Sequence, residues 1–181
     1  AEGVDFAIVR AGNRGYTEGA LYADERFSEN VDGAEAAGLA TGVYFFSQAV
    51  TPDEAREEAD FVLGLLAGRP LDLPVAFDHE PVSDETGRAN HLAGTELAAC
   101  ARAFCERIEQ AGYDTLVYGN KRDIARFGGD VPDGRPVWFA EYDVAVPTGQ
   151  FDFVMWQYTS TGTVAGISTR VDLNIRFDAV G

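Results

Sequence analysis

The feature that most narrows the possible folds is an alternation of short apolar segments with longer segments of helical periodicity. The apolar segments have the character of buried strands and span residues 4–11, 41–46, 73–82 and 115–118. The segments that carry an apolar stripe at helical spacing span residues 24–37, 51–68 and 95–110. Such an alternation predicts a parallel sheet whose strands are joined by crossover helices.

The pattern changes beyond residue 120. A short helix is predicted over residues 120–127, and the remaining apolar segments read as strands at residues 137–141, 154–158 and 169–173. Gly- and Pro-bearing loops join these strands without a long helix between them. The predicted fold is therefore α/β, an irregular TIM-like β/α barrel with regular βα units early and mostly strands in the last third. With no linker or repeat in view, residues 1–181 are predicted to form a single domain.

Two local signals refine this outline. Residues 12–23 are rich in Gly, Asn and Tyr and predict a loop after the first strand. The run Thr51-Pro52-Asp53-Glu54 predicts a helix start in which Thr51 caps the helix and Glu54 completes a capping box.

Composition excludes several classes of function. The net charge is −16, from 30 acidic and 14 basic residues, which argues against nucleic acid and anionic membranes as partners. No apolar tract is long enough to span a bilayer. Cys100 and Cys105 stand five positions apart on a predicted helix, too far around its axis to bond, and are expected to be apolar fillers or surface thiols. The histidines are isolated, so a zinc site has little support.

The predicted strand over residues 73–82 ends in two acids, Asp78 and Glu80, separated by His79. Alternate side chains of a strand share a face, so the acids point the same way and His79 points the opposite way, toward a structural role. Two neighbouring carboxyl groups raise each other's pKa, so one can hold a proton while the other stays ionised. A pair of carboxyl groups, one protonated and one ionised, can cleave a glycosidic bond. The alternative is a solvated strand end whose acids cap the next loop.

Polar and aromatic side chains also end most of the other predicted strands. They are Arg10, Tyr44, Phe46, Tyr118, Trp138, Tyr142, Trp156, Gln157, Tyr158 and Asp172. In a β/α barrel the carboxyl ends of the strands meet at the mouth that holds the chemistry. Aromatic rings stack on the C–H faces of a sugar while acids and amides bond its hydroxyls, so these residues predict a sugar-binding groove. Taken singly, each aromatic side chain could equally belong to the core.

Several segments, in this order, carry a resemblance to a known family. They are Gly3–Gly12, Asp24–Asn30 with Ala37–Leu39, Gly42–Ser47, Leu73–Glu80, Val137–Tyr142, Trp156–Ser160, and Gly166–Ile167 with Val171–Asn174. Together they resemble the glycoside hydrolase family 25 lysozymes, the Chalaropsis-type muramidases, whose fold is an irregular barrel of eight strands. Phe45 stands where many members of that family have His.

The resemblance implies an N-acetylmuramidase that cuts the β-1,4 bond between N-acetylmuramic acid and N-acetylglucosamine in peptidoglycan. It implies that Glu80 is the general acid and that Asp78 either stabilises positive charge at the reacting centre or orients the substrate's N-acetyl group. Asp172 matches a further acid of the active site, and the implied wall of the groove consists of Tyr44, Tyr118, Trp138, Tyr142 and Gln157. With Phe46 these residues form the predicted substrate-binding set.

The resemblance implies no metal or organic cofactor, and it implies glycan strands of peptidoglycan as the partner. The expected place of action is extracellular or cell-wall associated, either for an exported enzyme or for a phage lysin. Family members usually begin with one more strand, which supplies another active-site Asp, so this chain alone is expected to have little lytic activity. Two alternatives stay open: a non-catalytic glycan-binding domain, and a metal-dependent hydrolase that uses Asp78, Glu80 and Asp172 as ligands.

Overall fold

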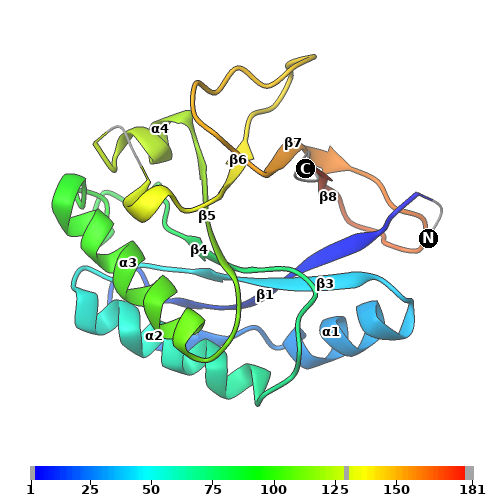
Figure 1. The fold of residues 1–181 in the computed structure, drawn as a ribbon, viewed down its shortest axis with the longest axis horizontal. Helices are drawn as coiled ribbons and strands as arrows, with labels where there is room; N and C mark the ends of the chain where they lie inside the picture. The colour runs from blue at the N-terminus through cyan, green and yellow to red at the C-terminus, as the bar shows by residue number, and fades with distance from the viewer. Residues whose placement is uncertain (1–2, 129–130, 178–181) are drawn as a thin grey trace.

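The computed structural model describes residues 3–128 and 131–177. One eight-stranded sheet, in the order β2-β1-β3-β4-β5-β6-β7-β8, curls into an open barrel (Figure 1). The strands are β1 (Phe6–Arg14), β2 (Leu21–Ala23), β3 (Ala40–Phe46), β4 (Val75–Asp78), β5 (Thr115–Asn120), β6 (Val137–Ala140), β7 (Met155–Gly162) and β8 (Val171–Arg176). The helices are α1 (Phe27–Ala36), α2 (Pro52–Leu66), α3 (Gly94–Gln110) and α4 (Lys121–Ala125), with a short 3-10 turn at Pro132–Gly134.

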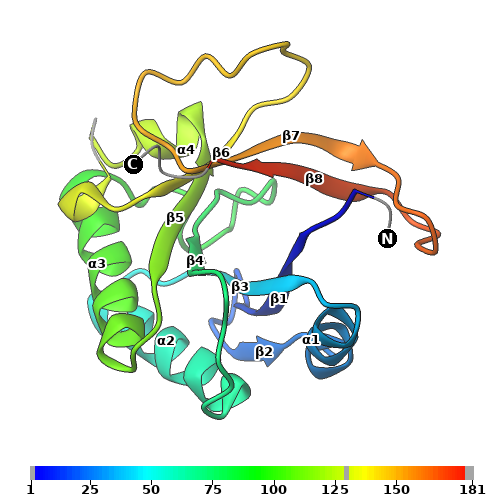
Figure 2. The same ribbon diagram turned by 45° about the vertical axis from the view of Figure 1, so that its right-hand side comes forward.

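The sheet is parallel from β1 through β7 and antiparallel at both ends, where β2 pairs with β1 and β8 pairs with β7. This arrangement confirms the irregular β/α barrel, with βα units early and strands late. The turned view places α1, α2 and α3 outside the curl, with β7 and β8 extending along its opposite side (Figure 2). The last connection is too short for a crossover helix, so β8 returns beside β7 as a hairpin partner.

The loop predicted over residues 12–23 is wrong at both of its ends. Strand β1 continues to Arg14, and β2 pairs back on it with Gly12 opposite Ala23. A Cβ atom on Gly12 would lie 2.1 Å from the carbonyl oxygen of Tyr22, so glycine here permits close pairing of two backbones. The glycine that suggested a loop therefore marks an irregular, tightly paired strand.

Side chains alternate across the sheet and divide the core in two. Val75 and Phe77 of β4 face the helices, where Phe77 packs against Phe104 of α3 with ring centroids 5.3 Å apart. Ala76 faces the inside of the curl together with Leu116, Trp138 and Met155. Because Asp78 follows Ala76 by two positions, the same alternation carries its carboxyl group to the concave side.

Helix α2 begins with Thr51 as its cap, because the Thr51 hydroxyl accepts a hydrogen bond from the amide of Glu54 at 3.2 Å. The prediction that Glu54 completes a capping box is wrong, because its carboxylate does not bond the amide of Thr51. The Glu54 carboxylate accepts from the amide of Val50 at 2.8 Å, and it also pairs with Arg88 at 2.6 Å. The helix start is thereby tied to the loop that follows β4. In α3, Cys100 and Cys105 are both free and buried, as expected of apolar fillers.

Candidate active site

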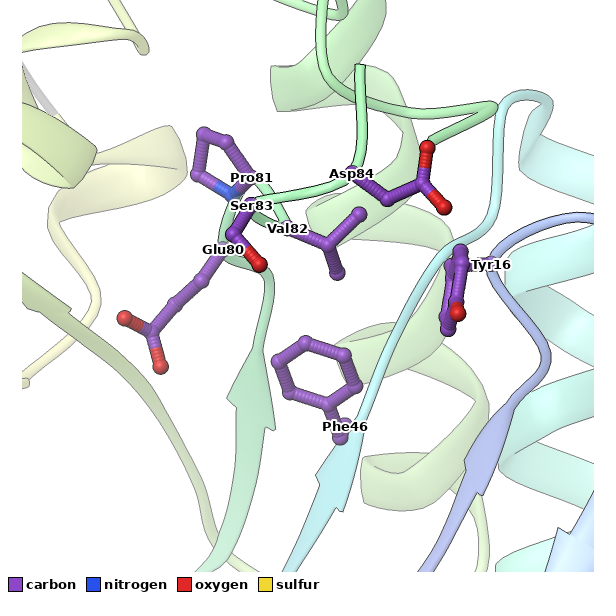
Figure 3. Close-up of a pocket in the computed structure, with 7 residues that line it drawn as sticks. All are labelled: Tyr16, Phe46, Glu80, Pro81, Val82, Ser83 and Asp84. Carbon is purple, nitrogen blue, oxygen red and sulfur yellow. The ribbon is translucent and has the colours of Figure 1, made fainter. Parts of the chain in front are cut away.

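A cavity of about 370 Å³ opens at the carboxyl ends of the parallel strands, inside the curl. It is lined by Arg10, Tyr44, Phe46, Asp78, Glu80, Tyr118, Trp138, Gln157 and Asp172. A neighbouring cavity of about 410 Å³ shares Phe46 and Glu80 with it (Figure 3). The sheet register explains why these residues meet, because Asp78 stands opposite Phe46 on one side and Tyr118 on the other.

Asp78 and Glu80 form a buried acid pair in this cavity. Both carboxyl groups line the cavity, and because the negative charge of Glu80 disfavours ionisation of Asp78, the pair favours holding one proton. Burial and the charge of Glu80 raise the pKa of Asp78 well above its usual range. Burial and the charge of Asp123 likewise raise the pKa of Glu80. The Oδ1 atom of Asp78 is buried without a hydrogen-bond partner among the described residues.

The wall of the cavity is built from hydrogen-bonded aromatic side chains. Trp138 lies at the centre, with its ring centroid 4.7 Å from that of Tyr118 and 6.3 Å from that of Tyr44, both edge-on. Its indole nitrogen donates to Asn174 of β8 at 2.8 Å. The hydroxyl groups of Tyr118 and Tyr142 both donate to the side-chain oxygen of Gln157. These bonds fix the rings in place before a ligand arrives.

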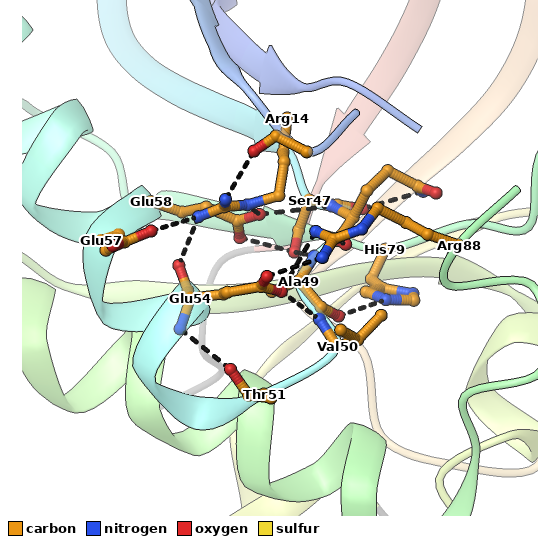
Figure 4. Close-up of polar contacts among 12 residues, drawn as sticks. Arg14, Ser47, Ala49, Val50, Thr51, Glu54, Glu57, Glu58, His79 and Arg88 are labelled. Atoms are coloured by element: carbon orange, nitrogen blue, oxygen red, sulfur yellow. Dashed lines mark hydrogen bonds and ion pairs between the residues drawn. The ribbon is translucent and has the colours of Figure 1, made fainter. Parts of the chain in front are cut away.

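A polar network around Glu58 joins Arg14 of β1 to Ser47, which follows β3 (Figure 4). The side chain of Gln48 donates to the carbonyl oxygen of Glu80 at 2.9 Å. The fully buried carboxylate of Glu58 fixes the segment before α2, accepting from the Ser47 hydroxyl at 2.6 Å and from Arg14 at 2.8 Å. The position of the acid pair therefore depends on charged groups that do not line the cavity.

His79 faces away from the cavity, as expected, and stacks on Phe77 in the helix-facing layer. Its Nε2 atom lies 3.3 Å from the carbonyl oxygen of Ala49. Arg126, just after α4, donates to the carbonyl oxygen of His79 at 2.9 Å and also lies 3.2 Å from its Nδ1 atom. Burial and the charge of Arg126 lower the pKa of His79 to about 4, so the ring is neutral in its structural position.

With this geometry in place, the comparison with known families is decisive. The model of glycosyl hydrolases family 25 matches residues 1–167. This chain belongs to glycosyl hydrolase family 25.

Known relatives agree with this assignment. The family 25 chain is 28% identical over 172 residues to the autolytic lysozyme of Clostridium acetobutylicum, covering 95% of this chain and 48% of that protein. It is 29% identical over 184 residues to Lysozyme M1 of Streptomyces globisporus, covering 95% of this chain and 60% of that protein. It thus spans about half the length of the curated relatives it matches. The fold also resembles that of the modular autolysin LytC of Streptococcus pneumoniae, which was solved in complex with a synthetic peptidoglycan ligand. The TM-score is 0.81 at 24% sequence identity, and the match covers 94% of this chain and 40% of LytC.

The fold brings together nearly all of the side chains predicted from the sequence. Those that line the cavity are Asp78, Glu80, Tyr44, Phe46, Tyr118, Trp138, Gln157 and Asp172. Tyr142 is absent from the lining and reaches the site through its bond to Gln157. The roles of these residues in a reaction stay predictions.

Three residues that contribute to this family 25 site could not be assigned from the sequence. Arg10 lines the cavity and its charge lowers the pKa of Asp78, whereas its sequence position indicates only the end of a strand. Asn174 holds Trp138. Asp123, buried at the start of α4, raises the pKa of both acids. A capping pattern at Asn120 was the one available signal for Asp123, and that pattern indicates a helix end rather than a site.

The residues that the structure describes contain no group of three or more His, Cys, Asp or Glu side chains arranged to hold a metal ion. Within the same residues, none of the helices is both long and apolar enough to cross a membrane.

Gln157→Leu is expected to lower the free energy of unfolding by about 2 kcal/mol, because two tyrosine hydroxyls lose their shared acceptor in a partly buried site. Urea unfolding followed by circular dichroism measures the loss. Gln150→Leu, on an exposed loop, makes the same chemical change and should cost little. Equal stability of the two variants would contradict the role of Gln157 as the anchor of the aromatic wall.

Proposed function

We propose that this family 25 chain is the catalytic domain of a lysozyme, an N-acetylmuramidase that hydrolyses peptidoglycan. The observation that carries the proposal is the buried acid pair of Asp78 and Glu80 at the mouth of an aromatic-walled cavity. Family membership and the lysozymes among its relatives support the same conclusion. The bond cleaved is the β-1,4 linkage between N-acetylmuramic acid and N-acetylglucosamine.

Glu80 suits the role of proton donor, because it lies past the end of β4, is less buried than Asp78 and borders both cavities. The proton shared by the pair goes from Glu80 to the glycosidic oxygen, which leaves with the electron pair of the broken C–O bond. Water then adds to the anomeric carbon and returns a proton to Glu80.

With the proton on Glu80, Asp78 is ionised beneath it. Its carboxylate, which lines the cavity, can then face positive charge at the anomeric carbon, or accept a hydrogen bond from the acetamido N–H of the sugar. Trp138 and Tyr44 supply ring faces and edges for the sugar, and Asp172 supplies an acceptor for its hydroxyls.

The substrate places this reaction at the cell wall. An enzyme that cuts peptidoglycan works outside the cytoplasmic membrane, either as an exported autolysin or as a phage lysin that reaches the wall during release. The partner is the glycan strand, and neither nucleic acid nor membrane lipid is needed for the reaction.

Release of reducing sugar from purified peptidoglycan by this chain tests the proposal directly. New reducing ends that carry muramic acid are the expected product, and reducing ends of N-acetylglucosamine alone would contradict the bond assignment. The low lytic activity expected from the sequence stays a prediction that the same assay measures. A glycan-binding domain would retain the strands and release nothing.

Hydrolysis should depend on pH through the single proton of the acid pair. The raised pKa values mean that activity falls as pH rises and the pair loses its proton, and also falls in acid, where the pair takes up a second proton. Asp123→Asn removes a negative charge that raises both pKa values, so the alkaline limb of the kcat/KM profile should move to lower pH. An unmoved limb would contradict the electrostatic role of Asp123.

A further inference from the structure

The second cavity has a chemical character of its own. It is lined by Tyr16, Phe46, Glu80, Pro81, Val82, Ser83 and Asp84. Figure 3 shows the Asp84 carboxylate on the same side as the Tyr16 ring, while the Glu80 carboxylate lies on the opposite side. None of these lining residues carries a positive charge, so the cavity combines two aromatic rings with two acids.

Two hydrogen-bonded loops fix the walls of this cavity before any ligand binds. The loop that carries Tyr16 closes on itself, because the amide of Gly15 donates to the carbonyl oxygen of Ala20 at 2.8 Å. It is joined to the other loop by a 2.8 Å bond from the amide of Arg88 to the carbonyl oxygen of Tyr16. The side chain of Asn90 then fixes the second loop by donating to the carbonyl oxygen of Asp84 at 2.7 Å. Preorganised walls of this kind reduce the cost of binding.

Hydrogen bonds stabilise the ionised form of the Asp84 carboxyl group. Its Oδ1 atom accepts from both the amide and the hydroxyl group of Thr86, at 2.8 and 2.7 Å. These bonds lower the pKa of Asp84, which keeps the carboxylate ionised at mildly acidic pH. The ring of Tyr16 is 43% exposed beside it. An ionised carboxylate next to an accessible aromatic ring is suited to an organic ammonium group.

We propose that this second cavity binds the ammonium group of a peptide carried by the glycan strand, so that Tyr16 and Asp84 select peptide-bearing strands over bare ones. The inference rests on the proposed function. Glu80 borders both cavities, so a sugar whose bond is cut at Glu80 has its own substituents within reach of Tyr16 and Asp84.

The test compares three soluble glycan substrates with the full chain. The first carries a stem peptide with a free lysine amine, the second carries the same peptide with that amine acetylated, and the third has had its peptide removed. We expect kcat/KM to be about tenfold higher for the first substrate than for the other two. Asp84→Asn keeps an acceptor for Thr86 and should remove most of that preference, with unchanged rates on the two amine-free substrates. Glu85→Gln makes the matching change at the next, exposed position and should behave as wild type.

Equal kcat/KM for all three substrates in the wild type would overturn the inference while leaving the proposed function intact. An equal loss on all three in Asp84→Asn would also overturn it, because Asp84 would then act on the common sugar chain. Cleavage of none would instead contradict the proposed function. In that case calorimetry with a muramyl tripeptide ending in L-lysine, against its Nε-acetyl form, still decides the inference: tighter binding of the free amine supports it and equal binding overturns it.

Discussion

Glu80→Gln is expected to reduce kcat for peptidoglycan hydrolysis by about 10²- to 10⁴-fold, which is the contribution of a positioned general acid. Glutamine has the same side-chain length as glutamate, and its backbone carbonyl oxygen can still accept the hydrogen bond from the side chain of Gln48. It has no acidic proton to give to the leaving oxygen. Release of reducing sugar from purified peptidoglycan, compared with wild type at one pH, measures the loss.

The same variant should be at least as stable as wild type. The raised pKa values of Asp78 and Glu80 show that keeping both acids ionised in the cavity is unfavourable, and glutamine removes one of the charges. Thermal unfolding therefore separates loss of chemistry from loss of fold. Glu85→Gln, which alters an exposed acid outside the cavities, should leave activity unchanged. Wild-type activity in Glu80→Gln would refute the acid role of Glu80.

The second large effect concerns stability. Arg14→Met is expected to lower the free energy of unfolding by about 3–5 kcal/mol, because it removes the cation that faces a buried carboxylate. Glu58 is fully buried and Arg14 nearly so, with the guanidinium nitrogen 2.8 Å from the carboxylate oxygen. The guanidinium also donates to the carbonyl oxygen of Gly19 at 2.7 Å, so its loss loosens the loop that carries Tyr16. Urea unfolding at pH 8 measures the change.

The loss should be smaller at pH 5. Burial raises the pKa of Glu58 to about 7, even with the bonds from Ser47 and Arg14. A carboxyl group whose pKa is raised by folding contributes stability at low pH, and that contribution is lost as pH rises through the folded value. Without Arg14 the carboxyl group can take up a proton at pH 5 and avoid a buried charge.

Two further variants sharpen this comparison. Arg14→Met combined with Glu58→Leu removes both charges and should recover most of the lost stability. Arg56→Met breaks the exposed pair with Asp53, whose two side chains are 52% and 94% exposed, and should cost less than about 1 kcal/mol. A double variant as unstable as Arg14→Met alone would show that packing, rather than the unpaired charge, accounts for the loss.

The early part of the fold could be predicted because periodicity there reports burial directly. The apolar stripe of α2 and the capping residue Thr51 are local signals, and both elements appear where the sequence places them. The β1–β2 hairpin was missed because its glycines have the composition of a loop. Only the pairing of Gly12 with Ala23 shows that they serve close backbone contact.

The acid pair could be predicted for the same reason, since a spacing of two on a strand fixes a common face. The groups that shift the pKa values of the pair could not be predicted from the sequence. Asp123 and Arg126 stand more than forty positions from Asp78 in the chain, and their influence comes from the packing of α4 against β5, the neighbour of β4. Asn174 likewise acquires its role only when β8 lies beside β7 and reaches Trp138.

The hairpin of β7 and β8 also bears on how long the cavity keeps its shape. Asp172 lines the cavity and Asn174 holds Trp138, and both belong to β8, which pairs in the sheet with β7 alone. Elements at the edge of a sheet open at lower free energy than the body of a domain. The cavity can therefore come apart, and be re-formed, while the helices and the central strands stay folded. We therefore expect the site to lose its shape before the molecule as a whole unfolds.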